Sequence, residues 1–369
     1  MNNNTSKPAL RRRVAQIVLA FLVVLFLSFN AIAWLHAWSI THYAPVNART
    51  TRALEIHTAS DRVWLLLHGP TIRRMANTTT PAQYNLPYHT LAFPGSQGAR
   101  LEAWCIPGQP GRPSVLMFPG FGGSKDTLLH AAVEFHQAGC ETWLVDFAGV
   151  GDSEGSTTTI GWREAEDVGA AVRATQSQRG GPLVLYGTSM GASAVLCAVH
   201  RGFVDPDALI LECPFDRLTT PIGNRLAQFG IPKFPLANGI AFWVGMQNGF
   251  NGFDHNPADY ARDVRCPVLL MQGDHDQFMG SVSVNSIAAA MGAHATLKIL
   301  PNCGHSYLVR DGEPVWRSQV REFLAQKVSG SRKQVARDTA PSCRASDLTV
   351  SVSALRSPAA SALGAGRCG

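Results

Sequence analysis

A glycine-flanked serine at residues 187–191, with the sequence G-T-S-M-G, constrains the fold of this chain more than any other feature. It follows an apolar run at residues 183–186 that predicts a short buried strand, and it precedes an apolar run at residues 192–200 that predicts a helix. A G-x-S-x-G turn between a strand and a helix is a nucleophile elbow, which lifts the serine hydroxyl clear of the sheet. Glycine stands on both sides because the turn is too tight for larger side chains. In a chain with 34 glycines the pattern can arise by chance, so its surroundings must decide.

Those surroundings predict an α/β fold. A chain of 369 residues can hold one large α/β domain with additional segments. Short apolar strands alternate with helices, which favours a mostly parallel central sheet with helices on both faces. Residues 215–262 interrupt the alternation and are rich in Phe, Gly, Asn and Pro, which indicates a small helical lid over the carboxyl edge of the sheet. We expect strands at residues 53–57, 63–68, 100–106, 114–118, 141–146, 183–186, 208–211, 267–271 and 296–300, and helices at 125–138, 161–178, 192–200, 282–291 and 314–327.

The N-terminus contains a run of 22 uncharged residues at 14–35, and about 20 apolar residues suffice to cross a bilayer as a helix. Three arginines at residues 11–13 precede the run, and Trp34 and Trp38 lie at its far end. Basic residues stay in the cytoplasm and tryptophan prefers the membrane interface. Residues 1–38 are therefore predicted to be a cytoplasmic basic end and a transmembrane anchor, with the catalytic domain exported to a periplasmic or other extracytoplasmic space.

A cleavable signal peptide is the competing interpretation of the same run. Residues 31–33 read A-I-A, which is a pattern for signal-peptide cleavage, with an apolar core at residues 14–29 before it. Cleavage there would secrete the protein instead of anchoring it. Both interpretations export the catalytic domain.

Charge is unevenly distributed along the chain, whose formal net charge is +6. Residues 1–52 contain six basic and no acidic side chains, and residues 329–369 contain six basic and two acidic ones, so residues 53–328 are mildly acidic. The overall basicity is therefore no argument for nucleic-acid binding, and we expect none. We interpret residues 39–52 as a linker. Residues 329–369 are rich in Ser, Ala, Arg and Gly, cannot bury a core, and are predicted to be a disordered tail.

Four motifs together resemble the α/β-hydrolase superfamily over nearly all of residues 53–328. They are P-G-F-G-G at 119–123, D-F-A-G-V-G-D-S-E-G at 146–155, the elbow, and the pair G-D-H-D at 273–276 with C-G-H at 303–305. The short lid and single N-terminal apolar helix are most similar to the Bem46-like or the serine-aminopeptidase-like branch. The resemblance implies an α/β-hydrolase fold with a Ser-Asp-His triad.

Ser189 is the predicted nucleophile, and it needs a base within hydrogen-bond reach. His305 follows the last predicted strand and is the predicted base. The acid that orients the histidine should follow the strand at 267–271. The family pattern places the acid three residues past the glycine, which implies Asp276, with Asp274 as a turn residue. Glu212 and Asp216, after the preceding strand, are the alternatives.

The predicted oxyanion hole consists of two backbone N–H groups aimed at the developing negative charge. Met190, directly after the nucleophile, supplies one. Phe121, between glycines in the 119–123 loop, is expected to supply the other. The alternative is that Phe121 is only a lid-facing aromatic, and the two roles are compatible.

No cofactor or metal is predicted. Residues 149–151 begin like a dinucleotide loop, but Glu154 stands where the third glycine belongs. The histidines show no metal-ligand spacing. Export would permit disulfides, but the cysteine positions lead us to expect none. The lid aromatics either pack within the lid or line an acyl pocket, and they are Phe242, Trp243, Phe250 and Phe253.

These features predict a serine hydrolase that cleaves a carboxylic ester through an acyl-enzyme. The same triad would serve an amide or peptide hydrolase, or an acyltransferase that passes the acyl group to an alcohol. A hydrolase fold used as a non-catalytic binding module is the third class. The expected partners are a small-molecule ester or amide and, through residues 14–35, a membrane.

Overall fold

A computed structural model describes residues 7–51, 58–305 and 308–328 of the chain. Two sequence predictions, the strand at 53–57 and the disordered tail at 329–369, lie outside the described residues.

The core of the molecule is an eight-stranded sheet with the order β1-β2-β4-β3-β5-β6-β7-β8. Pairing is antiparallel between β1, β2 and β4, and parallel from β4 through β3 to β8. The predicted mostly parallel sheet, including all seven strands expected from residue 100 onward, is confirmed. The strands are β1 (His89–Pro94), β2 (Arg100–Ile106), β3 (Ser114–Phe118), β4 (Glu141–Asp146), β5 (Leu183–Thr188), β6 (Ala208–Glu212), β7 (Val268–Gly273) and β8 (Ala295–Leu300).

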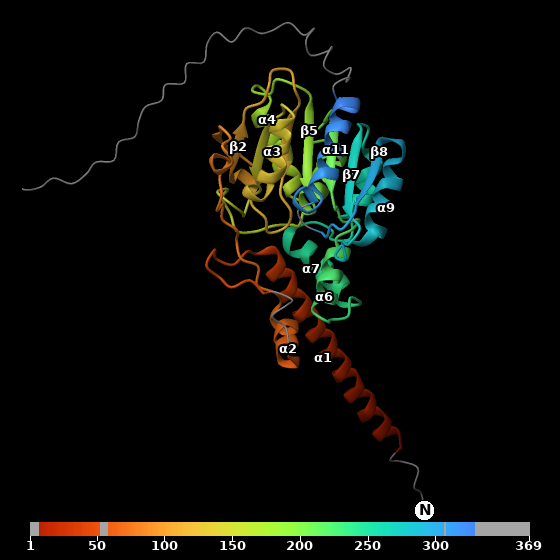
Figure 1. Cartoon of the computed structure of the whole chain (residues 1–369). Coiled ribbons are helices and arrows are strands. Elements are labelled where there is room, and N and C mark those ends of the chain that lie inside the picture. The colour runs from red at the N-terminus through yellow and green to blue at the C-terminus, as the bar shows by residue number, and fades with distance from the viewer. Residues whose placement is uncertain (1–6, 52–57, 306–307, 329–369) are drawn as a thin grey trace, which may run out of the picture.

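Helices cover both faces of this sheet, as predicted (Figure 1). One apolar core lies under α3 (Leu129–Gln137), α10 (Leu308–Asp311) and α11 (Glu313–Phe323). A second core lies under α4 (Glu164–Thr175), α5 (Met190–His200) and α9 (Gly280–Met291). Strands β3 and β5 are buried on both faces and contain uninterrupted apolar runs at residues 115–118 and 183–186, which explains why the sequence predicted them well.

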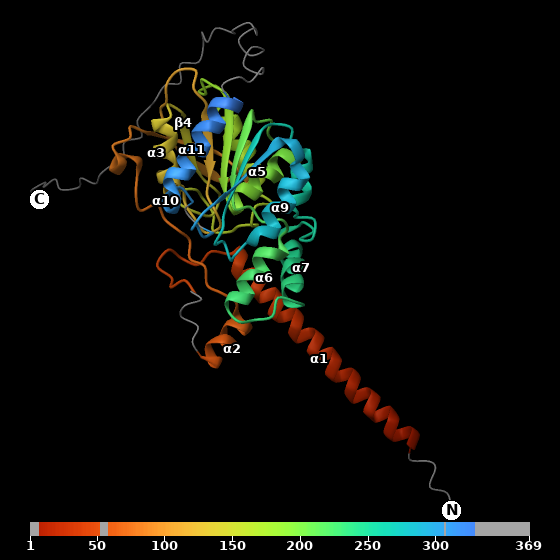
Figure 2. The same ribbon diagram turned by 45° about the vertical axis from the view of Figure 1, so that its right-hand side comes forward.

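Three further helices follow β6 at the carboxyl edge of the sheet. They are α6 (Thr219–Gln228), α7 (Leu236–Asn248) and α8 (Pro257–Tyr260). Helices α6 and α7 lie beside the long N-terminal helix, on the side of the molecule from which that helix projects (Figure 2). We call residues 215–262 the lid.

The strand predicted at residues 63–68 is wrong, because this run lies in helix α2 (Ala59–His68). Five consecutive apolar residues, Val63 to Leu67, are compatible with either a helix or a buried strand. The decision comes from a capping box at the helix start: the Thr58 side chain accepts from the Asp61 N–H at 3.1 Å, and the Asp61 carboxylate accepts from the Thr58 N–H at 2.8 Å. Strand β1 was not predicted, since its apolar and polar residues do not alternate and it pairs on one side only.

Helix α1 (Lys7–Thr41) projects from the domain and extends three residues into the predicted linker. Its segment Leu10–Thr41 has a mean hydropathy of 2.5 and is long and apolar enough to cross a membrane. The part near the domain is not exposed, because Ala33 and Ala37 are fully buried in the core that includes α7. Past its end, the Tyr43 N–H donates to the Ser156 carbonyl at 2.7 Å, which joins the helix to the domain.

Candidate active site

Ser189 occupies the sharp turn between β5 and α5. Its backbone angles are φ 50° and ψ −112°, a conformation that non-glycine residues rarely adopt. A Cβ at Gly187 would lie 2.6 Å from the Ala192 nitrogen, and a Cβ at Gly191 would lie 2.4 Å from the Phe118 oxygen. Neither site has room for a side chain, so the predicted need for flanking glycines is confirmed.

His305 and Asp276 reach Ser189 from the loops that follow β8 and β7. The Ser189 Oγ lies 3.0 Å from His305 Nε2, and His305 Nδ1 lies 2.8 Å from an Asp276 carboxylate oxygen. Parallel strands end at one edge of the sheet, which is why residues 116 positions apart meet. The three predicted triad residues therefore form one continuous hydrogen-bonded chain.

Asp276 is surrounded by hydrogen-bond donors. Besides His305, its carboxylate accepts from Gln272 Nε2 at 2.5 Å and from the backbone N–H groups of Phe278 and Met279 at 2.9 Å each. Burial alone would raise the pKa of Asp276, but the hydrogen bonds and the charge of His305 outweigh it and lower that pKa. The carboxylate is therefore ionised at neutral pH, as an acid that orients a histidine must be.

The three other carboxylates considered for this role are engaged elsewhere. Each lies on a loop or strand end near the same edge, so sequence position alone does not separate them from Asp276. Asp274 has hydrogen-bond and ion-pair partners in Cys303 and His275. Glu212 accepts from Tyr186 and Trp316. Asp216 contacts Thr220, Ser283 and Arg217.

The 119–123 loop lies against the elbow. A Cβ added to Gly120 would stand 3.5 Å from the Ser189 Cβ, so the loop backbone passes within van der Waals contact of the serine. Phe121 and Met190 both border the cavity that holds Ser189 and His305. The ring of Phe121 lies 6.1 Å from that of Tyr43, just beyond α1.

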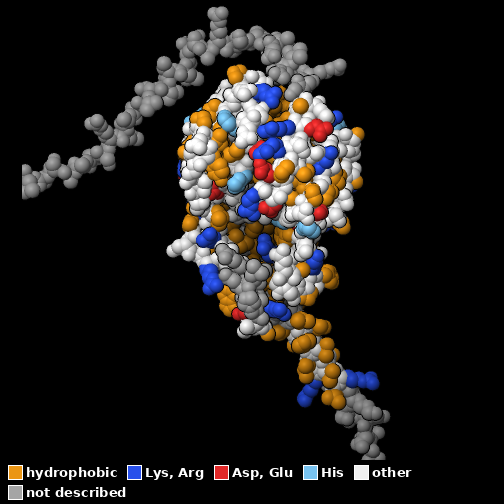
Figure 3. All heavy atoms as spheres, viewed as in Figure 1, with side chains coloured by type: hydrophobic (Ala, Val, Ile, Leu, Met, Phe, Trp, Pro, Cys, Tyr) orange, Lys and Arg blue, Asp and Glu red, His pale blue; other side chains and the backbone are white. Residues whose placement is uncertain are grey.

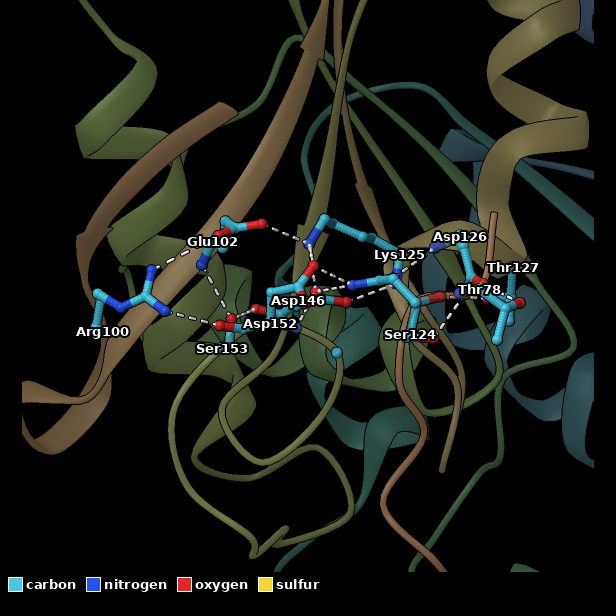
Figure 4. Close-up of polar contacts among 12 residues, drawn as sticks. Thr78, Arg100, Glu102, Ser124, Lys125, Asp126, Thr127, Asp146, Asp152 and Ser153 are labelled. Atoms are coloured by element: carbon cyan, nitrogen blue, oxygen red, sulfur yellow. Dashed lines mark hydrogen bonds and ion pairs between the residues drawn. The ribbon is translucent and has the colours of Figure 1, made fainter. Parts of the chain in front are cut away.

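Directly after this loop, Lys125 forms an ion network that the sequence analysis missed (Figure 4). Its fully buried ammonium contacts Asp146 at 2.6 Å, Asp152 at 2.8 Å and Glu102 at 3.0 Å. Burial opposes the charged ammonium, but these carboxylates outweigh it and raise the pKa of Lys125. Asp146 and Asp152 belong to the 146–155 motif, and the acidic residues of that motif could have indicated the ion network in the sequence. The network joins that motif to the end of the 119–123 loop.

A cavity of about 530 Å³ extends from Ser189 and His305 between the sheet edge and the lid. None of the four lid aromatics considered for an acyl pocket lines it. Trp243 instead donates to the Asn30 side chain at 3.1 Å, and Phe250 stacks on Trp162 at 5.0 Å between centroids. These two aromatics therefore pack, as one interpretation expected, and these two partners, in α1 and at Trp162, lie outside the lid.

Cys213, Asp276 and His305 place one potential metal-ligand atom each within 4.8 Å of one another. Burial, and then the charges of Asp276 and Glu212, raise the pKa of the Cys213 thiol well above its ordinary range. Metal binding needs the thiolate, so this environment disfavours a metal at these three residues.

A family model described as "Alpha/beta hydrolase family" matches residues 115–317, which span β3 to α11 and include all three triad residues. The chain belongs to the alpha/beta hydrolase family. This confirms the predicted superfamily and the predicted fold class, and it supports hydrolase activity.

Several curated proteins are similar to this alpha/beta hydrolase. The uncharacterized protein YqkD of Bacillus subtilis is 25% identical over 52% of this chain, and the match spans 64% of YqkD. The alpha/beta hydrolase domain-containing protein WAV2 of Arabidopsis thaliana is 23% identical over 69% of this chain and 84% of its own length. The uncharacterized membrane protein YNL320W of Saccharomyces cerevisiae is 29% identical over 37% of this chain and 49% of its own length.

Solved structures share the fold of this alpha/beta hydrolase. An esterase of Pyrococcus furiosus superposes with a TM-score of 0.59 at 19% identity, covering 69% of this chain and 97% of the esterase. The alpha/beta hydrolase GrgF from a Penicillium species superposes with a TM-score of 0.52 at 22% identity, covering 66% of this chain and all of that chain.

Proposed function

We propose that this alpha/beta hydrolase is a serine hydrolase that cleaves carboxylic esters through an acyl-enzyme. The observation that carries the proposal is the chain of hydrogen bonds from Ser189 through His305 to Asp276, at 3.0 and 2.8 Å. A serine hydroxyl is a weak nucleophile unless a base is within reach, and in this proposal His305 is the base and Asp276 the acid that orients it.

In the proposed reaction, His305 Nε2 takes the hydroxyl proton while Ser189 Oγ bonds to the ester carbonyl carbon. The negative charge on the carbonyl oxygen is stabilised by the backbone N–H groups of Phe121 and Met190. Asp276 accepts from His305 Nδ1 and stabilises the imidazolium. The bond to the alcohol oxygen breaks as His305 returns the proton to it, and a water activated by His305 then releases the acid.

A panel of substrates tests this proposal. We expect p-nitrophenyl esters to be hydrolysed faster than aminoacyl anilides by the purified full-length protein. Faster cleavage of the anilides would make the enzyme an amide or peptide hydrolase, and transfer to added alcohol in preference to water would make it an acyltransferase. A fluorophosphonate probe should label wild type at Ser189, whereas a folded protein without labelling would be a binding module.

We further propose that α1 anchors the domain outside the cytoplasmic membrane instead of being cleaved. Three arginines at residues 11–13 hold the N-terminus in the cytoplasm. The competing cleavage site ends at Ala33, which is fully buried in a continuous helix. Cleavage there would remove the Asn30 side chain that accepts from Trp243 in the lid, so retention of the helix suits the fold better.

A further inference from the structure

We propose that the substrates are phospholipids of the bilayer that α1 crosses, and that the lid and α2 dip into the surface of that bilayer. The inference rests on the proposed ester hydrolysis and names the substrate class of that same site. It follows from where the membrane must lie along α1, from the residues exposed at that level, and from the walls of the cavity.

The position of the membrane follows from the length of α1. Twenty residues from 14 to 33 rise about 30 Å, which is the thickness of the hydrocarbon core of a bilayer. Residues 14–28 are exposed, as a membrane-spanning segment would be, and burial by the rest of the protein begins at Phe29. A Cβ added to Gly239 in α7 would lie 2.8 Å from Phe29 and 3.1 Å from Ala33. Helix α7 therefore contacts α1 at the outer boundary of the hydrocarbon core.

Polar contacts also fix the orientation of the domain relative to α1 at this boundary. Asn30 accepts from Trp243 at 3.1 Å, and the Trp34 carbonyl accepts from Gln247 Nε2 at 3.0 Å. Helices α2, α6 and α7 all lie around the domain-proximal part of α1 (Figures 1 and 2). Because the anchor and the lid are packed together, the lid meets the bilayer whenever α1 spans it.

Large apolar side chains are exposed at this level. Outside α1, half of the exposed large apolar residues of the described chain belong to α2, to α7 or to the loop just before α7. These residues are Val63, Trp64, Leu67, Phe234, Phe242 and Met246. Phe234 and Met246 are 78% and 61% exposed. Apolar helices with basic neighbours bind at the interface of anionic membranes. Residues 219–250 contain Arg225 and Lys233 and no acidic residue. Apolar and basic side chains are visible where α1 meets the domain (Figure 3).

The cavity at Ser189 is lined by residues of α1 and α6, the two helices that pack against α7, and by none of α2 or α7. Ile40 of α1 forms part of its wall, together with Ile72 and, from α6, Ile222. The interior is mostly apolar, and Arg73 and Arg225 are also among the residues that border it. This combination suits an acyl chain in the cavity and a phosphate at an arginine on its border.

The chemistry needs no new component. The Ser189 Oγ bonds to the acyl carbonyl carbon of the phospholipid, and the bond to the glycerol oxygen breaks. His305 gives that oxygen the proton it took from Ser189, so a lysophospholipid leaves. Water then hydrolyses the acyl-serine, and a fatty acid is released.

The test uses the full-length protein in vesicles of phosphatidylethanolamine and phosphatidylglycerol. Fatty-acid release is measured beside hydrolysis of soluble p-nitrophenyl butyrate, and the ratio of the two rates is the readout. For the double variant Phe242→Gln/Met246→Gln we expect the ratio to fall about tenfold, since each change weakens apolar contact with the bilayer. Val315→Gln, an exposed apolar position on α11, is the matched control and should keep the wild-type ratio. Phe242→Leu should keep it too, which separates loss of apolar surface from misfolding.

A second arm tests the headgroup. Arg225→Gln should slow release from phosphatidylglycerol more than release from diacylglycerol in the same vesicles. Turnover of p-nitrophenyl butyrate without fatty-acid release would overturn the phospholipid proposal and leave the proposed function standing. An unchanged ratio in the double variant would overturn the bilayer contact, and equal slowing on both lipids by Arg225→Gln would overturn the phosphate site. Failure to hydrolyse either ester, with Ser189 unlabelled by a fluorophosphonate, would instead contradict the proposed function itself.

Discussion

The ammonium of Lys125 lies 2.6 Å from the carboxylate of Asp146, and both side chains are completely shielded from solvent. The Lys125 N–H also donates to Asp146 at 2.6 Å. Lys125, two positions after the 119–123 loop, is therefore joined to the carboxyl end of β4 by both its backbone and its side chain.

Lys125→Met should destabilise the protein severely. The variant leaves Asp146 buried without its counter-charge, and breaking a buried pair in this way typically costs about 3–5 kcal/mol. Denaturant unfolding measures the loss. Arg262→Met is the matched control, because its pair with Asp259 is exposed and should contribute less than about 1 kcal/mol. Equal small losses for the two variants would show that the network contributes little to stability.

Ser189→Ala should abolish turnover and leave the fold intact, since alanine fits the elbow. We expect kcat to fall by about 10³-fold or more, and His305→Ala to cost a similar factor because triad members act as a unit. Steady-state kinetics on a nitrophenyl ester, with thermal unfolding as the folding control, checks both. Near-wild-type activity in either variant would contradict the assignment.

Asp276→Asn should lower kcat by about 10²–10⁴-fold, because an amide can hold the wrong histidine tautomer and cannot stabilise the imidazolium. Asp274→Asn is the control. Its carboxylate accepts from the Cys303 N–H at 3.3 Å, which is a role in the turn, so it should change kcat little. The reverse ranking would move the acid to Asp274.

Because of Glu212, the free energy of unfolding should fall as the pH rises above 4.5. Burial raises the pKa of Glu212 from 4.5 to about 7, although its hydrogen bonds from Trp316 at 2.6 Å and Tyr186 at 2.8 Å act in the opposite direction. Between these two pH values the folded state binds more protons than the unfolded state. The free energy of unfolding should therefore decrease through this window, by on the order of 2–3 kcal/mol.

Glu212→Gln tests that window, since the amide oxygen can still accept both hydrogen bonds but does not titrate. Unfolding in urea across pH 4–8 should show a flatter profile for this variant than for wild type. Glu322→Gln, on the exposed side of α11, should retain the wild-type profile. An unchanged slope in Glu212→Gln would assign the pH dependence to other groups.

The N-terminal helix should hold the protein in the membrane with its catalytic domain outside. With a tag at each end, both tags should fractionate with membranes on one chain, and external protease should remove the C-terminal tag. A soluble form without the N-terminal tag would mean a cleaved signal peptide. A soluble full-length chain in the cytoplasm would contradict both interpretations.

The sequence by itself determined the elbow, seven of the eight strands and the candidate triad, because each depends on local order. Glycine beside Ser189, apolar runs at strand length, and polar residues directly after β7 and β8 are all visible along the chain. The residues at 63–68 were misread because their apolar run suits a helix equally well, and the cap at Thr58 decides it. The edge strand β1 was not predicted from the sequence, because half of its environment is solvent.

Only the tertiary structure decided matters that depend on distant contacts. It placed the Asp276 carboxylate 2.8 Å from His305 Nδ1, whereas Glu212, the last residue of β6, accepts from Tyr186 and Trp316. It revealed that Lys125 is buried among three carboxylates from other elements, and it showed the end of α1 packed against the lid and lining the cavity. Such relations arise because the sheet brings strand ends together from far along the chain, which no local pattern encodes.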